Sequence, residues 1–494
     1  MRYRAAVSLN PTPTFFWHDY ETFGADPRRA RPAQFAGVRT DAELNEIGDP
    51  VMFHCRPAPD FLPDPHSVLI TGITPQEALS RGLPEREFAL AIEKELGRAG
   101  TIGVGYNSIR FDDEVTRFLL WRTLGDPYAR EWQNGCGRWD LIDVVRLTWA
   151  LRPEGIEWPL HESGEMAGRP SFRLEHLTRA NGIAHEGAHD ALSDVRATLE
   201  LARLIRRHQP RLWDFCLKLH RKDAVKAEIG AGRPFLHLSG RYPLERGRLA
   251  IVWPLAPHPR NANEVILWDL SEDPRQLLGL DAATLRRRLF TRADDLAPGE
   301  TRLPIKTLHL NRSPMVASDL RVLRGAAARF GLPVEQALAH AQEAPAVTAA
   351  MAGLWADVFE RPRSDDAVVD VDEDLYGGFL VPEDRRQLQR LRELDGDALS
   401  ARRPAFEDDR LEELFFRYRA RHFPQTLDVT ERERWEAHRF ARLMEGQAGA
   451  LTLQAYGETI DALAETAIEA DDERAQALLE ALVDYGESIA PDAP

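Results

Sequence analysis

The stretch Phe15-Phe16-Trp17-His18-Asp19-Tyr20-Glu21-Thr22 combines an apolar run with two acids spaced two residues apart. The apolar residues predict a buried strand, and side chains at i and i+2 of a strand leave the same face. Asp19 and Glu21 are therefore expected side by side, where they repel each other and lose hydration unless cations offset the cost. The pair indicates a metal site, although a chain with 79 Asp and Glu residues also produces this spacing by chance.

Two further acidic segments follow along the chain. A helix predicted over residues 85–98 leads to an apolar strand over 101–106 and then to Asp112-Asp113-Glu114, where a new helix begins. Acids in a first helical turn complement the helix dipole, which explains two of these three. Farther on, His189-Asp190-Ala191-Leu192-Ser193-Asp194 opens another helix. A histidine just before a helix and an acid one turn inside it can converge on one point.

The histidine spacing leaves two alternatives. His185 stands five residues before Asp190, and His189 stands five residues before Asp194. Asp190 occupies the position of a helix N-cap, a structural role that Asp fills well. Asp194 lies one turn inside the helix, where its carboxylate can face the strand acids. We therefore favour His189 with Asp194 over His185 with Asp190.

The order of these residues resembles the DEDDh class of 3′→5′ exonucleases, relatives of the polymerase proofreading domains. Longer blocks are similar to the bacterial exonuclease I family of single-strand DNA exonucleases, and the similarity covers nearly the whole chain. These blocks are His18-Asp19-Tyr20-Glu21-Thr22-Phe23-Gly24, Arg31-Pro32-Ala33-Gln34-Phe35, Leu69-Ile70-Thr71-Gly72-Ile73-Thr74-Pro75-Gln76-Glu77, Ser171-Phe172-Arg173-Leu174-Glu175-His176-Leu177, Arg417-Tyr418-Arg419-Ala420-Arg421 and Phe423-Pro424-Gln425-Thr426-Leu427-Asp428.

This resemblance implies an α/β fold with three parts. The expected parts are a ribonuclease-H-like exonuclease domain with a mixed sheet, an SH3-like domain with helical insertions, and an α-helical C-terminal domain. Their predicted bounds are residues 14–207, 211–361 and 365–490. The first boundary follows Arg206-Arg207-His208-Gln209-Pro210, because a proline after a long helix marks its end.

Local patterns support this division. Strand-like stretches occur at residues 249–253 and 264–269, and helix-like segments occur at 407–421 and 431–446. The acidic segment from Ser364 to Asp374 is interpreted as a linker, the usual meaning of a short charge run.

The resemblance also implies an enzyme that degrades single-stranded DNA in the 3′→5′ direction and releases 5′-mononucleotides, acting in DNA repair and recombination. The implied metal ligands are Asp19, Glu21, Asp112 and Asp194, and Glu21 is also expected to touch the substrate. Hard oxygen ligands suit two Mg²⁺ ions about 3.5–4 Å apart, with Mn²⁺ as a substitute. His189 is the candidate base for the attacking water, because a histidine with a near-neutral pKa can take that proton.

Two alternatives to this function are weighed on the same residues. A 3′→5′ exoribonuclease would use an identical active site, and only the full-length resemblance favours DNA. A non-catalytic nucleic-acid-binding adaptor is the alternative outside the enzymes. A non-catalytic relative has no reason to keep four mutually repelling acids and a histidine in register, so the complete set favours an enzyme.

Overall charge excludes a protein that binds nucleic acid through a generally positive surface, since the formal net charge is −16. Any DNA track must be local. Arginines and aromatic residues alternate after Asp112, a mixture that suits single strands because guanidinium groups hold phosphates and rings stack on bases. Arg173, in the Ser-Phe-Arg-Leu block, is the strongest candidate for a phosphate contact. The other predicted substrate contacts are Arg117, Tyr128, Trp132, Arg146 and Lys222.

Expectations about surroundings and partners complete the sequence-based picture. Three cysteines without paired or metal-binding spacing fit a reducing cytoplasm, and no apolar run is long enough to span a bilayer. We expect a monomer without membrane contact. The family resemblance implies binding of the acidic, phenylalanine-ending tail of the single-strand-binding protein, for which the basic candidates are Arg152, Arg321 and Arg324. Residues beyond about 211 are expected to hold the strand between cuts.

Overall fold

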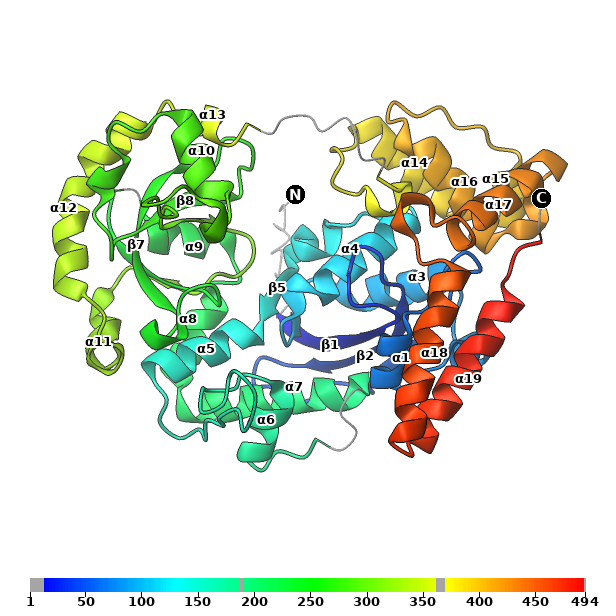
Figure 1. Cartoon of the computed structure of the whole chain (residues 1–494), viewed down its shortest axis with the longest axis horizontal. Helices are drawn as coiled ribbons and strands as arrows, with labels where there is room; N and C mark the ends of the chain where they lie inside the picture. Colours follow the sequence, from blue (N-terminus) through cyan, green and yellow to red (C-terminus); the bar gives the residue numbers. More distant parts are fainter. Residues whose placement is uncertain (1–12, 186–189, 231, 361–368, 493–494) are drawn as a thin grey trace, which may run out of the picture. The chain divides into compact units, whose positions relative to one another are not determined.

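The computed structural model describes residues 13–185, 190–230, 232–360 and 369–492 (Figure 1). The chain forms two compact units. The first unit combines Met1–Gly137, His185–Leu199 and Asp366–Pro494, so that segments from the N-terminal and C-terminal parts of the chain share one body. The second unit combines Arg138–Ala184 and Glu200–Asp365. Within the described residues, no helix has both the length and the apolar character needed to cross a membrane.

The first unit contains β1 to β4 of a mixed sheet whose strand order is β3-β2-β1-β4-β5. β1 pairs antiparallel with β2 on one side and parallel with β4 on the other. The strand predicted from the opening stretch is confirmed, because β1 is almost entirely buried between these neighbours. The strands are β1 (Thr14–Thr22), β2 (Pro32–Thr40), β3 (Val51–His54), β4 (Thr101–Gly105) and β5 (Gly137–Asp140).

Helices of the nuclease part cover this sheet. The predicted helices after residues 85 and 112 are confirmed as α3 and α4. A core of aromatic and aliphatic side chains, including Phe16, Tyr20, Phe88 and Leu119, joins β1 to both helices. The helices are α1 (Pro65–Thr71), α2 (Pro75–Arg81), α3 (Glu85–Leu96), α4 (Asp112–Arg122) and α7 (Ala191–His208), the last of which continues into the second unit.

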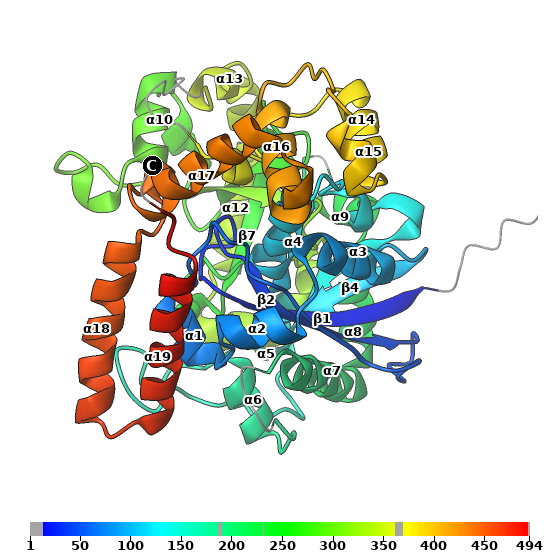
Figure 2. The same ribbon diagram turned by 90° about the vertical axis from the view of Figure 1, so that its right-hand side faces the viewer.

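The C-terminal helices belong to the same unit as the nuclease strands. Phe118 and Trp121 of α4 are buried in one cluster with leucines of α14 and α16. Phe23, directly after β1, is buried in another cluster with Tyr456 and Leu482, and Figure 2 shows the α18–α19 pair beside α1. The helices are α14 (Pro382–Arg392), α15 (Gly396–Ser400), α16 (Arg410–His422), α17 (Val429–Leu443), α18 (Leu453–Glu469) and α19 (Glu473–Ser488).

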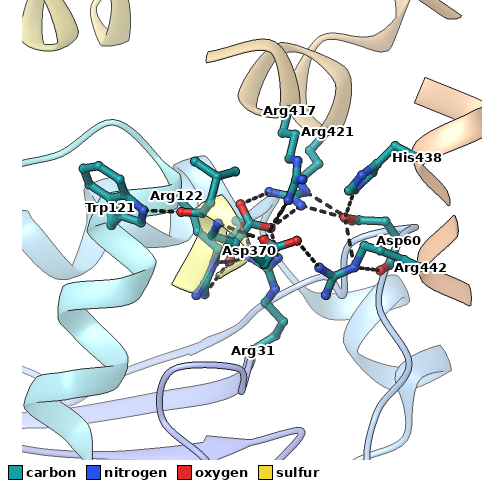
Figure 3. Close-up of polar contacts among 12 residues, drawn as sticks. Arg31, Asp60, Trp121, Arg122, Asp370, Arg417, Arg421, His438 and Arg442 are labelled. Carbon is teal, nitrogen blue, oxygen red and sulfur yellow. Dashed lines mark hydrogen bonds and ion pairs between the residues drawn. The ribbon is translucent and has the colours of Figure 1, made fainter. Parts of the chain in front are cut away.

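The interpretation of the acidic segment as a linker is wrong for its last part. Asp370 and Asp372 are only 7% and 3% exposed. Both carboxylates form ion pairs with arginines of α16, and Figure 3 shows Asp370 among them. A charge run is solvated only when no partner reaches it, and here the partners lie 47 and 49 residues farther along the chain. Residues 361–368 lie outside the described part of the chain.

The second unit contains an antiparallel sheet with the order β10-β6-β7-β8-β9, which confirms the strands predicted near residues 249 and 264. Its strands are β6 (Phe235–Leu238), β7 (Leu249–Pro257), β8 (Glu264–Asp269), β9 (Ile305–His309) and β10 (Val316–Ala317). Its helices include α5 (Leu141–Leu151), α6 (Leu174–Ala180), α8 (Pro210–Lys218), α9 (Lys222–Ile229), α10 (Ala282–Phe290), α11 (Arg324–Phe330), α12 (Val334–Met351) and α13 (Trp355–Val358). The helices α10–α13 interrupt or follow the strands, as helical insertions do.

Candidate active site

Three predicted metal ligands meet at the end of β1. Carboxylate oxygens of Asp19, Glu21 and Asp194 all lie within 4.8 Å of one another. Asp19 and Glu21 leave the same face of β1, as their spacing predicted, and Asp194 reaches them from the first turn of α7. The two distant segments therefore present one group of oxygen ligands.

Strand register brings the start of α7 to this position. Glu21 on β1 is paired with Gln34 on β2. The Gln34 side-chain oxygen accepts a hydrogen bond from the backbone N–H of Ala191, the first residue of α7, at 3.2 Å. Asp190 accepts a hydrogen bond from the Ser193 N–H at 3.1 Å, which confirms its predicted role as a helix cap.

The fourth predicted ligand, Asp112, faces the same strand but lies outside the group of three oxygens. Its Oδ1 accepts a hydrogen bond from the Tyr20 backbone N–H at 3.1 Å. β1 pairs with β4 only as far as Trp17. Beyond that residue the Tyr20 N–H donates to Asp112 at the start of α4 rather than to β4. Asp112 is thereby fixed beside Asp19 and Glu21.

The electrostatics of the group are those of crowded like charges. Burial raises the pKa of Asp19 well above its usual range, and the charges of Asp112, Glu21 and Asp194 raise it further. Burial also raises the pKa of Glu21 to about 8, with Asp194 and Asp112 as the next causes. Each carboxylate therefore costs free energy when ionised, and a divalent cation held between them removes that cost. The oxygen-only donor set of this group fits a hard cation.

The predicted catalytic histidine, His189, lies outside the described residues, so its role stays a prediction. The alternative, His185, contacts the site directly because its Nε2 forms a hydrogen bond with Asp194. The pairing of His185 with Asp190 that we weighed from the spacing is not the one formed, since Asp190 caps the helix.

Three predicted substrate contacts lie in the first unit. Arg117 is buried, and its guanidinium donates to Glu131 and Glu114 at 2.7 Å each, ion pairs that weigh against a phosphate contact. The ring of half-buried Tyr128 lies 5.2 Å from the same guanidinium. Trp132 is 67% exposed, which leaves its face open for stacking.

The other three predicted contacts lie in the second unit. Arg173 precedes α6, keeps 67% of its side chain exposed and has Glu175 3.7 Å away. Arg146 is largely buried and forms an ion pair with Asp143 at 2.8 Å. Lys222 donates a hydrogen bond to the Asn263 side chain, and burial lowers its pKa. Of these three side chains, Arg173 is the most exposed.

Two exposed aromatic residues of the first unit were not among the predicted substrate contacts. Phe379 is 94% exposed and Tyr376 is 46% exposed. The Tyr376 ring packs edge-on against Phe118 of α4, with 5.6 Å between ring centres, and its hydroxyl donates to Glu114. The sequence Tyr376-Gly377-Gly378-Phe379 could have indicated their exposure, because two aromatic residues flank a glycine pair that favours a turn over a core element.

Family models match three consecutive parts of the chain. The model described as Exonuclease matches residues 16–202, the Exonuclease I SH3-like domain matches residues 220–361, and the Exonuclease I C-terminal domain matches residues 369–489. Exodeoxyribonuclease I of Escherichia coli is 43% identical over 481 residues, which cover 96% of this chain and 98% of that protein. The chain belongs to the exonuclease I family.

Solved structures of this exonuclease I family agree with the whole fold. Exonuclease I from Methylocaldum szegediense superposes with a TM-score of 0.87 at 47% identity, covering 97% of this chain and 99% of that one. A zinc-bound complex of E. coli exonuclease I with single-stranded DNA gives a TM-score of 0.86 at 43% identity, covering 97% and 100%. The predicted α/β class with a mixed sheet, an SH3-like domain and a helical C-terminal domain is confirmed.

The raised pKa of Glu21 predicts how metal-free protein responds to pH. Between pH 4.5 and about 8 the folded state keeps a proton on Glu21 that the unfolded state releases. Folded protein then binds more protons than unfolded protein, so stability from this group falls as pH rises through that window. In EDTA, Glu21→Gln should raise the melting temperature at pH 8 and leave it unchanged at pH 4. The corresponding gain in the free energy of unfolding at pH 8 is a few kcal/mol at most.

The exposed residue Glu43 supplies a matched control, because Glu43→Gln removes the same charge outside the site. Added Mg²⁺ should stabilise the wild type at pH 8, since a ligand that binds only the folded state raises its melting temperature. Equal behaviour of Glu21→Gln and Glu43→Gln at both pH values would contradict the crowded-charge description.

Proposed function

We propose that the chain is a metal-dependent exonuclease that removes 5′-mononucleotides from the 3′ ends of single-stranded DNA. The observation that carries this proposal is the group of Asp19, Glu21 and Asp194, whose oxygens lie within 4.8 Å of one another, with Asp112 beside it. Membership of the exonuclease I family supports DNA over RNA, because an exoribonuclease would need the same acids.

The reaction is hydrolysis of the last phosphodiester bond. A water oxygen attacks the phosphorus, the bond from phosphorus to the 3′ oxygen of the preceding nucleotide breaks, and that oxygen takes a proton. The released nucleotide keeps a 5′-phosphate, and the shortened strand keeps a 3′-hydroxyl.

Each site residue has a stated part in that step. Asp19, Glu21, Asp112 and Asp194 would hold two Mg²⁺ ions, or Mn²⁺ in their place. When bound, these ions stabilise charge on the attacking and leaving oxygens. We assign His189 as the group that takes the proton from water, and His185 as a residue that orients Asp194 through their hydrogen bond.

Single strands are the proposed substrate for two reasons. The related E. coli protein has been captured with single-stranded DNA and zinc. In this chain, Trp132 and Phe379 expose aromatic faces on a molecule whose net charge of −16 offers no general attraction for DNA. Stacking contributes about 1–3 kcal/mol per base without requiring a particular sequence. The proposed role in DNA repair and recombination rests on the family resemblance. A cytoplasmic location is consistent with three cysteines that form no disulfide.

Degradation of end-labelled substrates tests the function. With Mg²⁺, single-stranded DNA labelled at its 5′ end should give a ladder that shortens from the 3′ end, whereas RNA and duplex DNA should resist. EDTA should abolish the reaction, and Asp19→Asn or Asp194→Asn should reduce its rate by about 10²–10³-fold or more while the protein stays folded. Glu43→Gln should cleave at the wild-type rate, and cleavage that persists in EDTA would refute the metal-dependent mechanism.

Separate replacement of the two histidines tests the assignment of the base. His189→Ala should lower the cleavage rate by about 10²–10⁴-fold, the usual contribution of a general base. His185→Ala should cost about tenfold, because Asp194 keeps its carboxylate and loses only an orienting partner. Single-turnover rates at saturating Mg²⁺ make the comparison. The reverse order of effects would assign the base to His185.

We also propose a docking site for the tail of the single-strand-binding protein. A pocket of about 570 Å³ in the second unit is lined by the three arginines predicted from the resemblance, Arg152, Arg321 and Arg324, together with Leu151, Glu154 and Gly325. Arginines can pair with an acidic peptide and its terminal carboxylate, and Leu151 offers apolar surface for a phenylalanine ring.

Titration with a labelled tail peptide tests this site. Arg152→Glu and Arg324→Glu should each weaken binding at least about tenfold, because a charge reversal replaces attraction with repulsion. Arg260→Glu, at an exposed position outside the pocket, is the matched control and should leave affinity unchanged. Binding that survives removal of the peptide's terminal phenylalanine, or that all three variants weaken equally, would contradict specific docking.

A further inference from the structure

Four carboxylates of the first unit are buried far from the metal ligands in sequence. Asp60, Glu85, Asp370 and Asp372 are between 1% and 7% exposed. Arginines surround them, and several of the contacts are drawn in Figure 3. We call this set the ion-pair cluster; it comprises Arg31, Asp60, Glu85, Arg122, Asp370, Asp372, Arg417, Arg421, His438 and Arg442.

Three of the carboxylates, Asp60, Asp370 and Asp372, alternate with arginines of the C-terminal helices. Asp372 accepts from Arg421 at 2.9 Å, and Arg421 also donates to Asp60 at 2.6 Å. Asp370 accepts from Arg417 at 2.7 Å and from Arg442 at 3.0 Å. Each carboxylate therefore has at least one positive neighbour, which is the condition for keeping charges buried.

The same cluster reaches α4, the helix that begins with Asp112. Asp372 accepts from Arg31 at 3.1 Å, and Arg31 donates to Glu85 at 3.1 Å. Glu85 in turn accepts from Arg122, the last residue of α4, at 2.9 Å. The preceding residue, Trp121, donates its indole N–H to the Val371 carbonyl at 2.7 Å. The end of α4 is thus bound to the segment around Asp372.

The cluster is also connected to the end of β1. The backbone carbonyl of Arg31 accepts a hydrogen bond from the N–H of Phe23 at 2.9 Å, two residues after Glu21. Phe23 is itself buried among residues of α18 and α19. The last residues of α4, the helix that begins with Asp112, therefore contact the C-terminal region. Phe23, which directly follows the strand that carries Glu21, contacts it as well.

Neighbouring arginines keep two carboxylates of the cluster, Asp372 and Glu85, in their ionised form. Burial alone would raise the pKa of Asp372, but the charges of Arg421, Arg417 and Arg31 hold it well below its usual range. Glu85 behaves likewise, with a pKa lowered to about 2 by Arg122 and Arg31 against the effect of burial. Asp372 and Glu85 therefore stay ionised at neutral pH.

We propose that the ion-pair cluster is a positioning device for metal binding, with Asp372 as its central residue. It holds α4 and the end of β1 against the repulsion among the site carboxylates, so that Asp112 stays beside Asp19 and Glu21. The C-terminal region is then part of the catalytic unit and not only a clamp for the strand. This inference rests on the proposed metal-dependent function.

Asp372→Asn tests the proposal with the shape of the side chain kept. Mn²⁺ binding is measured directly by electron paramagnetic resonance without DNA, and Mg²⁺ dependence of cleavage is measured separately. Both are recorded at a temperature where circular dichroism shows folded protein. The variant should bind Mn²⁺ about tenfold more weakly, in the range found when residues that support metal ligands are removed. Excess Mg²⁺ should restore most of its cleavage rate.

A matched control separates positioning from general destabilisation. Arg39 and Glu95 form another buried ion pair of the first unit, at 3.2 Å, and Arg39 also bonds Thr14 at the opposite end of β1. Glu95→Gln should lower the melting temperature, as Asp372→Asn does, and leave Mn²⁺ affinity unchanged. If Asp372→Asn does not fold, the charge-balanced pair Asp372→Asn with Arg421→Gln replaces it, and weaker Mn²⁺ binding is again expected.

Three results would overturn the proposal. One is wild-type Mn²⁺ affinity in folded Asp372→Asn, or in the folded double variant where it replaces the single one. Another is an equal loss of affinity in Glu95→Gln. A wild-type protein that binds no Mn²⁺ would refute the proposed function itself, and the positioning role would fall with it.

Discussion

Repulsion among the carboxylates at the end of β1 is the constraint that the surrounding structure has to satisfy. Asp19 and Glu21 share one strand face, and Asp194 adds a third acid within 4.8 Å. Without a cation these groups resist ionisation, as the raised pKa values of Asp19 and Glu21 show. Hydrogen bonds from Tyr20 to Asp112 and between His185 and Asp194 keep the acids directed inward. This repulsion favours metal binding, because the ion binds carboxylates that the fold has already brought together.

Buried aspartates elsewhere in the same unit show the opposite electrostatics. Asp372 is buried like the site acids, yet its pKa is lowered, because arginines rather than carboxylates surround it. The identity of the neighbours, and not burial, decides whether a carboxylate attracts a cation or anchors a helix. One unit therefore contains an acid-only group suited to a metal and a charge-balanced group suited to holding segments together.

Local patterns in the sequence were sufficient for the elements that carry the site. The spacing of Asp19 and Glu21 predicted one strand face, and the position of Asp190 predicted a helix cap. Ion pairs between residues far apart in the sequence could not be predicted from such local patterns. Asp372 looked like part of a linker, because its partner Arg31 lies 341 residues away. The predicted substrate contact Arg117 is an intermediate case: its ion pair with Glu114 has the i,i+3 spacing of neighbours on a helix, whereas its partner Glu131 lies 14 residues away and could not be assigned from a local pattern.

Replacing the ion-pair cluster with apolar side chains would preserve packing at little cost in stability. Apolar surfaces, however, tolerate sliding, whereas the contacts of Arg122 with Glu85 and of Trp121 with Val371 have fixed directions. A slip of one residue along a helix turns it by about 100° and shifts it by about 1.5 Å. Such a slip in α4 would turn Asp112 away from Tyr20 and from the other acids. In the proposed positioning role, directional bonds at one end of α4 protect the geometry at its other end, a function that leucines in the same core position could not supply.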